Sequence, residues 1–208
     1  MKVFPRICCI SLSILFLGCP TIRHPASTVP PGSPFGDTPE GTVRHVHSGM
    51  EFPAEKAKFT RTGVRQYDAR GLNVSAAYDF FSPRIAATVF IYPTPPVRSI
   101  GSPPAVIEAA RGRIAEGVFR GAMGEITQAH GDAELLEERE IPASDDGFDR
   151  PGYFARFTYT ANFAGRRQTV ESLLYTFSFV DDRWTVKYRI TYPAKSDATN
   201  AVERFLGF

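Results

Sequence analysis

Alternation of apolar and polar residues is the clearest pattern in this chain, and it predicts several β-strands. Apolar side chains recur at every second position from Leu72 to Phe80 and from Ile85 to Ile91. The same period runs from Tyr153 to Phe163, from Leu173 to Phe179 and from Trp184 to Tyr192. Because successive side chains of a strand point to opposite faces, each run predicts a strand with one buried face.

Turn residues between these runs predict hairpins. Asp181-Asp182 separates the last two runs, and Ala164-Gly165-Arg166 lies before the first of these two. Such short polar or glycine-containing links are typical of antiparallel neighbours. Weaker alternation predicts further strands around residues 133–141, 43–47 and 59–67.

Two segments have the period of a helix instead. Pro104 to His130 carries one apolar stripe with three- and four-residue spacing, and Pro103 and Pro104 suit its start. The stripe consists of Ile107, Ala110, Ile114, Val118, Ala122 and Ile126. A shorter helix is predicted over Asp197 to Leu206, with Ser196 or Asp197 as its N-cap. Its inward residues are Ala198, Ala201, Val202 and Phe205.

Four glycines interrupt the longer helical pattern: Gly112, Gly117, Gly121 and Gly124. Each costs about 1 kcal/mol relative to alanine in a helix. Two interpretations remain open: the glycines allow the helix to approach a sheet closely, or they mark a break in it.

Together the elements predict one α+β domain over residues 43–208. We expect an antiparallel sheet of about six to seven strands, with one polar face and the helices packed against the other. One long helix lies between the strand groups, and a short helix ends the chain. This order resembles the Mog/PsbP-like fold, whose understood PsbP-like members act mainly as protein-binding subunits. A cystatin-like or cone-shaped sheet is the alternative fold.

The first residues have the pattern of an export signal. Lys2 and Arg6 precede an uncharged, mostly apolar run from Ile7 to Leu17, which is too short to span a membrane. The run ends in Phe16-Leu17-Gly18-Cys19, which resembles the lipobox of bacterial lipoproteins. The resemblance implies that residues 1–18 are removed and that Cys19 is lipid-modified. A conventional signal peptide with incidental cysteines is the alternative.

Residues 19–42 are rich in proline, serine, threonine and glycine, and we expect them to form a disordered tether after the lipid. Pro20, not aspartate, follows Cys19, so the inner-membrane retention signal of enteric lipoproteins is missing. That favours the outer membrane, with the domain facing the periplasm or the exterior.

Charge and cysteine content narrow the possible partners. Lysine and arginine number 24 and acidic residues 22, and the totals balance once Lys2 and Arg6 are removed. A near-neutral domain lacks the basic excess of nucleic-acid binding proteins. The other cysteines, Cys8 and Cys9, lie in the segment expected to be removed, which leaves no pair for a disulfide and no thiolate for a metal site or catalysis.

A search for catalytic and metal motifs gives no candidate set, so no catalytic residue, metal ligand or cofactor is predicted. His45 and His47 share one strand face but have no third ligand nearby, and a zinc site needs three or four. His24 lies in the tether and His130 at a helix end. Asp145 to Asp149 lacks the spacing of a calcium loop, and Glu134 to Glu140 suits an exposed strand or a helix end.

The aromatic residues leave one open question. Phe80, Phe81, Phe90 and Tyr92 do not fit on one buried face; they line a groove or pack under a second layer, and a helix layer is favoured. The predicted function is a membrane-anchored envelope lipoprotein with a non-catalytic domain that binds or assembles with an envelope protein. The alternatives are an envelope hydrolase, in which His45 or His130 meets a carboxylate, and a carrier of a small apolar ligand.

Overall fold

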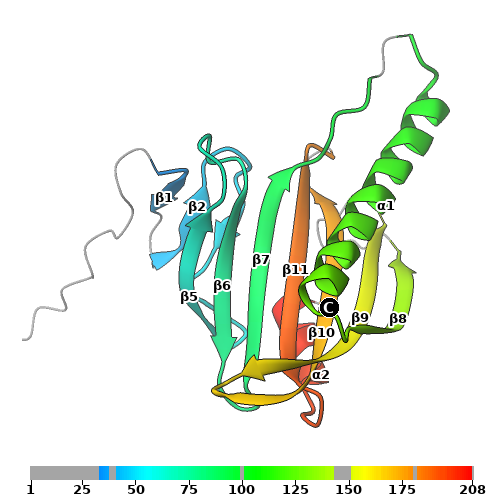
Figure 1. Ribbon diagram of the computed structural model, residues 1–208. Coiled ribbons are helices and arrows are strands. Elements are labelled where there is room, and N and C mark those ends of the chain that lie inside the picture. The colour runs from blue at the N-terminus through cyan, green and yellow to red at the C-terminus, as the bar shows by residue number, and fades with distance from the viewer. Residues whose placement is uncertain (1–32, 38–40, 99–100, 143–150, 180–181, 208) are drawn as a thin grey trace, which may run out of the picture.

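The computed structural model describes residues 33–37, 41–98, 101–142, 151–179 and 182–207. Its main sheet is built from eight strands: β4 (Glu55–Lys56), β5 (Phe59–Gln66), β6 (Val74–Phe80), β7 (Ile85–Pro93), β8 (Glu134–Ile141), β9 (Gly152–Phe163), β10 (Arg166–Phe179) and β11 (Trp184–Pro193). They lie in the order β4-β5-β6-β7-β11-β10-β9-β8, and every neighbouring pair is antiparallel (Figure 1).

A second, three-stranded sheet consists of β1 (Phe35–Asp37), β2 (Val43–His45) and β3 (Glu51–Phe52). It corrects the expected boundary of the tether at residue 42. Phe35 pairs with His45 and is 6% exposed, so the folded part of the chain includes residues 33–37. Cys19 and the rest of residues 1–32 lie outside the described residues.

The sheet and both helices agree with the predicted antiparallel sheet, long helix and short C-terminal helix. The helices are α1 (Pro104–Ala129) and α2 (Thr199–Leu206). The expected six to seven strands fall short of the observed number. Strands β3 and β4 have two residues each, which is too short for any alternation to appear.

The two helices lie on opposite faces of the main sheet, so the prediction of one helical face and one polar face is wrong (Figure 1). Phe119 of α1 stacks on Tyr153 of β9, with 5.2 Å between ring centroids. Phe205 of α2 packs on Tyr78 of β6, which points the other way, with 5.3 Å between centroids. We call these faces the α1 face and the α2 face.

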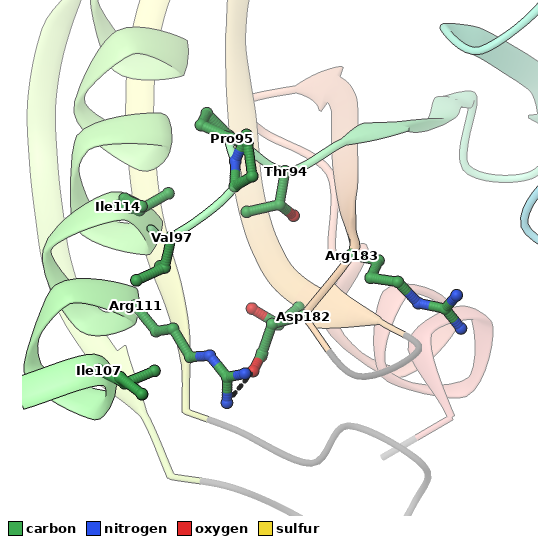
Figure 2. Close-up of a pocket in the computed structure, with 10 residues that line it drawn as sticks. Thr94, Pro95, Val97, Ile107, Arg111, Ile114, Asp182 and Arg183 are labelled. Carbon is green, nitrogen blue, oxygen red and sulfur yellow. Dashed lines mark ion pairs between the residues drawn. The ribbon is translucent and has the colours of Figure 1, made fainter. Parts of the chain in front are cut away.

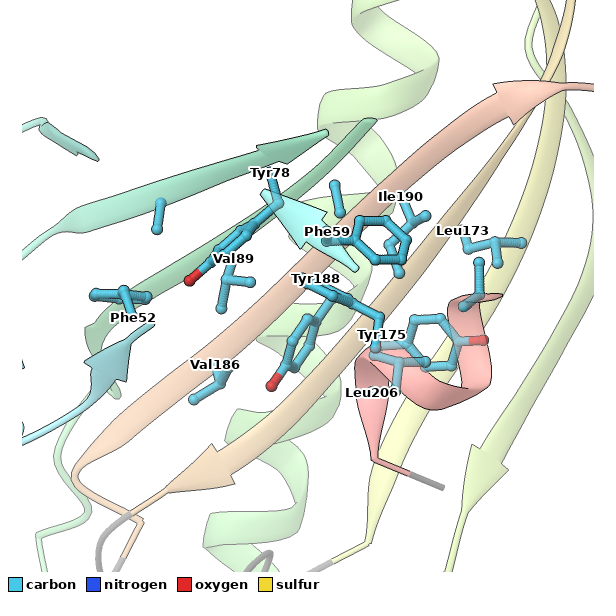
Figure 3. Close-up of a cluster of buried hydrophobic side chains, with 14 of the residues drawn as sticks. Phe52, Phe59, Tyr78, Val89, Leu173, Tyr175, Val186, Tyr188, Ile190 and Leu206 are labelled. Carbon is cyan, nitrogen blue, oxygen red and sulfur yellow. The ribbon is translucent and has the colours of Figure 1, made fainter. Parts of the chain in front are cut away.

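The α2 face carries the larger core, shown in Figure 3. Phe205 is 1% exposed, and its ring lies 4.4 Å from that of Phe59. Tyr188 and Leu206 are buried in the same cluster. Apolar residues of the small sheet also belong to this core, so most of the α2 face is covered.

Helix α2 starts differently from the prediction. Ala198 is its N-cap, and no side chain caps the helix from that position. Asp197 contributes from one residue earlier, where its Oδ1 accepts a hydrogen bond from the backbone N–H of Thr199 at 3.3 Å. All four predicted inward residues of this helix are buried.

Helix α1 packs on the sheet along its second half. Its buried residues are Phe119, Ala122 and Ile126, whereas Val106 in the first turn is 53% exposed. Figure 1 shows this helix running obliquely over β9 and β10. The predicted burial of the stripe is therefore confirmed at the C-terminal end of the helix, whereas the earlier residues of the stripe are only half-buried.

The glycines of α1 fit neither interpretation from the sequence. The helix is continuous from Pro104 to Ala129, so they mark no break. A Cβ built on Gly112, Gly117, Gly121 or Gly124 would meet no other atom within 4 Å, so they permit no close approach to the sheet either. Within the described ranges, neither helix combines the length and apolar character needed to cross a membrane.

Candidate functional site

A groove lies on the α1 face, where α1 borders the half of the sheet that it does not cover. Its volume is about 380 Å³. The sheet contributes Tyr67, Phe90, Tyr92 and Lys187, and α1 contributes Val118, Gly121 and Glu125. We call this site the α1 groove.

Strand pairing brings the lining residues of the sheet together. Phe90 of β7 pairs with Lys187 of β11 and with Ser75 of β6, so these three side chains lie side by side on one face. Tyr92 follows two positions later on the same face, because side chains alternate along a strand. Strand β11 is central in the sheet, and helix α1 passes beside it.

Lys187 is the unusual residue of the groove. It is 9% exposed, although lysine is almost never fully buried without a partner. Its ammonium lies 2.8 Å from Oε2 of Glu125 on α1. It also lies 4.7 Å from the ring centroid of Phe90 and 5.8 Å from that of Tyr92. One carboxylate and two aromatic rings thus stabilise a largely desolvated cation.

The tyrosines at the groove are held in place by neighbours on the same face. The Tyr67 hydroxyl is 3.0 Å from the Ser75 hydroxyl, and the Tyr67 ring is 5.9 Å from that of Phe90. Burial and, to a smaller extent, the Glu125 carboxylate raise the pKa of Tyr92 above its usual range. The Tyr92 hydroxyl is neutral at physiological pH, as an ordinary phenol is, and can donate a hydrogen bond.

A second, smaller cavity of about 240 Å³ lies under the N-terminal half of α1 (Figure 2). Figure 2 shows Ile107 and Ile114 of the helix on one side and Thr94 of the segment after β7 on the other. Arg111 spans the gap and pairs with Asp182 at 3.4 Å. Residues 99–100 and 180–181, next to this cavity in sequence, lie outside the described residues, so we place the candidate site in the α1 groove.

His45 has a structural environment. It is fully buried, its Nε2 donates to the Gly71 carbonyl at 2.8 Å, and its Nδ1 accepts from the Ser48 hydroxyl at 2.7 Å. Burial is the largest of several effects that together lower the pKa of His45. The ring ties β2 to the loop before β6 and packs edge-on against Trp184. His47 lies next to it but is exposed.

His130, at the C-terminal end of α1, stacks on Tyr159 with 3.8 Å between ring centroids. Burial, and then the positive charge of Arg189, lower its pKa. For both His45 and His130, the described hydrogen bonds and ring contacts are made with groups other than a carboxylate. In the described part of the chain, no group of three or more His, Cys, Asp or Glu side chains could hold a metal ion.

The aromatic residues that the sequence left open fall in different places. Phe90 and Tyr92 line the α1 groove beside the helix, so the favoured helix layer covers them only in part. Phe80 packs on the α2 core, and Phe81 at the β6–β7 turn is 66% exposed. Glu134 to Glu140 lies in edge strand β8, as expected, and Asp145 to Asp149 lies outside the described residues.

Lys187 was missed by the sequence reasoning, because it stands at a polar position of an alternating strand and such positions normally face water. A signal was present in the neighbouring sequence, where Phe90 and Tyr92 are apolar at positions that should also face water. No family model matches the chain, and comparison with curated proteins finds no match.

Proposed function

We propose that this chain is a lipid-anchored protein of the bacterial envelope whose folded domain is a non-catalytic binding module, with the α1 groove as its ligand site. The lipobox-like end of the leader supports the anchor on Cys19. The groove supports binding, and its composition favours a small ligand over a protein partner. Binding of an envelope protein, which the sequence favoured, stays a prediction.

The observation that carries the binding proposal is a groove of about 380 Å³ with three aromatic rings and one buried lysine. Small-molecule sites typically measure about 300–1,000 Å³, are mostly apolar, and contain a few polar groups that orient the ligand. The α1 groove lies within this size range and combines its three rings with a few polar groups. Since the core on the α2 face is filled by packed rings, the groove is the better place for the ligand of a carrier.

A neutral fluorescent probe tests the groove. Phenylnaphthylamine brightens in apolar sites, and we expect it to bind the purified protein in a saturable manner. Gly121→Leu places a side chain at the groove and should abolish this binding. Gly112→Leu is the matched control, because it lies about two and a half turns earlier, on the opposite side of α1. If both variants bind the probe with the affinity of the native protein, the groove is not the ligand site.

The anchor is tested separately with a Cys19→Ser variant. We expect the native protein to gain the mass of a diacylglyceryl group and to fractionate with membranes, and the variant to do neither. If both forms are soluble and cleaved identically, the leader is an export signal without a lipid. That result would leave the ligand site of the domain unaffected.

A further inference from the structure

We infer that the ligand of the α1 groove carries one anionic group, which takes the place of the Glu125 carboxylate on Lys187, and a flat apolar part, which lies on Phe90 and Tyr92. The inference rests on the proposed function and gives the ligand a chemical class: an aromatic amphipathic monoanion. The asymmetry of one ion pair and the surface around it support this class of ligand.

The two partners of the ion pair differ strongly in burial. The side chain of Lys187 is 11% exposed, whereas that of Glu125 is 64% exposed. Lys187 is confined by the central strand and by two rings, so it has little freedom to leave. Glu125 lies on the solvent side of the pair, so its carboxylate regains hydration when it rotates into water, and the cost of breaking the pair falls on Lys187.

The site then needs an anion whenever Glu125 moves away. A buried ammonium without a partner is unfavourable, since it has lost water and gained nothing in return. An anionic ligand group at the position of the Glu125 carboxylate restores the charge-assisted hydrogen bond. Lys187 is thus a fixed cation whose present partner is replaceable.

The surroundings add positive charge on the same face. Arg189 lies two positions along β11, and its guanidinium donates to neutral oxygens: the Tyr159 hydroxyl at 3.2 Å and the Ser172 hydroxyl at 3.3 Å. Arg65 of β5 lies over the Tyr67 ring at 5.2 Å. Among the carboxylates on this face, Asp79 lies four positions along β6 from Ser75, and Glu55 lies farther away on edge strand β4, where it pairs with Thr60. The field at the groove therefore favours an anion.

The apolar part of the ligand is specified by the rings. Phe90 and Tyr92 present their faces to the Lys187 ammonium, and Tyr67 extends the aromatic surface beyond Phe90. Aromatic groups pack well on such a surface in offset or edge-to-face arrangements. Gly121 keeps the helix side of the groove open, because nothing occupies the space where its Cβ would lie.

A matched pair of probes tests the charge of the ligand. Anilinonaphthalene sulfonate and phenylnaphthylamine share one ring system and differ by the sulfonate. We expect the native protein to bind the sulfonate at least about tenfold more tightly, the ratio typical of a charge-assisted hydrogen bond. Lys187→Met should remove this preference and retain neutral-probe binding, whereas Lys195→Met, at an exposed lysine, should leave both affinities unchanged.

Glu125→Gln provides an independent test, which holds even if Lys187→Met fails to fold. Removing the competing carboxylate should strengthen sulfonate binding several-fold and leave the neutral probe unchanged. Glu116→Gln is the control, because Glu116 is exposed on the same helix and pairs with Arg120. Equal affinity of the native protein for both probes, or no gain in Glu125→Gln, would overturn the inference. If instead Gly121→Leu binds the neutral probe as well as the native protein does, the proposed function is overturned.

Discussion

Gly152, at the start of β9, is a position where one added methyl group should destabilise the fold. The residue is buried and pairs with Ile141 of β8. A Cβ at this position would lie 2.9 Å from the backbone oxygen of Thr176 and would overlap the Phe177 ring. Real Cβ atoms are not found that close to backbone, so β10 or the ring must shift. Overpacking of this kind costs about 1–3 kcal/mol, which is the destabilisation expected of Gly152→Ala.

The matched control is the same substitution in α1. Gly121→Ala adds its methyl group to open space and should stabilise the helix by about 0.5–1 kcal/mol. Urea unfolding, followed by far-UV circular dichroism, should give midpoints that move in opposite directions while the slopes stay equal. In thermal unfolding, each kcal/mol corresponds to about 2–4 °C for a domain of this size. A Gly152→Ala protein as stable as the native one would refute the packing described around Phe177.

Two further predictions concern the core and the buried histidine. Phe205→Ala should lose about 3–5 kcal/mol in urea unfolding, because the ring is almost fully buried against Phe59 and Tyr78; a loss below about 1 kcal/mol would contradict that packing. His45 has a lowered folded-state pKa, so its contribution to stability is complete above about pH 6.5 and is lost as the pH falls from there toward the folded-state value. A series of unfolding midpoints between about pH 7.5 and 5 should show this loss, and the loss should be smaller in His45→Asn; equal losses would exclude His45 as the cause.

Most strands were predictable because their alternation survives in the sequence. β9, β10 and β11 each keep a continuous apolar face, and the links between them are turn residues. β1 was not predictable, since it lies in a proline-rich segment and its partner, β2, is three residues long. Phe35 becomes buried through a small sheet that local patterns do not reveal.

The candidate site depended on information that periodicity does not contain. Alternation shows that Phe90 and Lys187 point away from the larger core, but it does not show which strands become neighbours. The pairing of β7 with β11 places these two residues side by side, and α1 then supplies Glu125. The helix also covers a face that the sequence assigned to water. Lys187 is therefore a site residue only in the folded protein.

The order of the strands has a consequence for how the domain unfolds. β4 to β7 precede α1 in the chain and β8 to β11 follow it, and within each half neighbouring strands are consecutive. The ladder between β7 and β11 joins the halves and closes a long loop, which costs more chain entropy than a hairpin does. The α1 groove crosses this seam, with Phe90 and Tyr92 on one side and Lys187 on the other. A bound ligand would therefore contact both β7 and β11 and slow the separation of the two halves during unfolding.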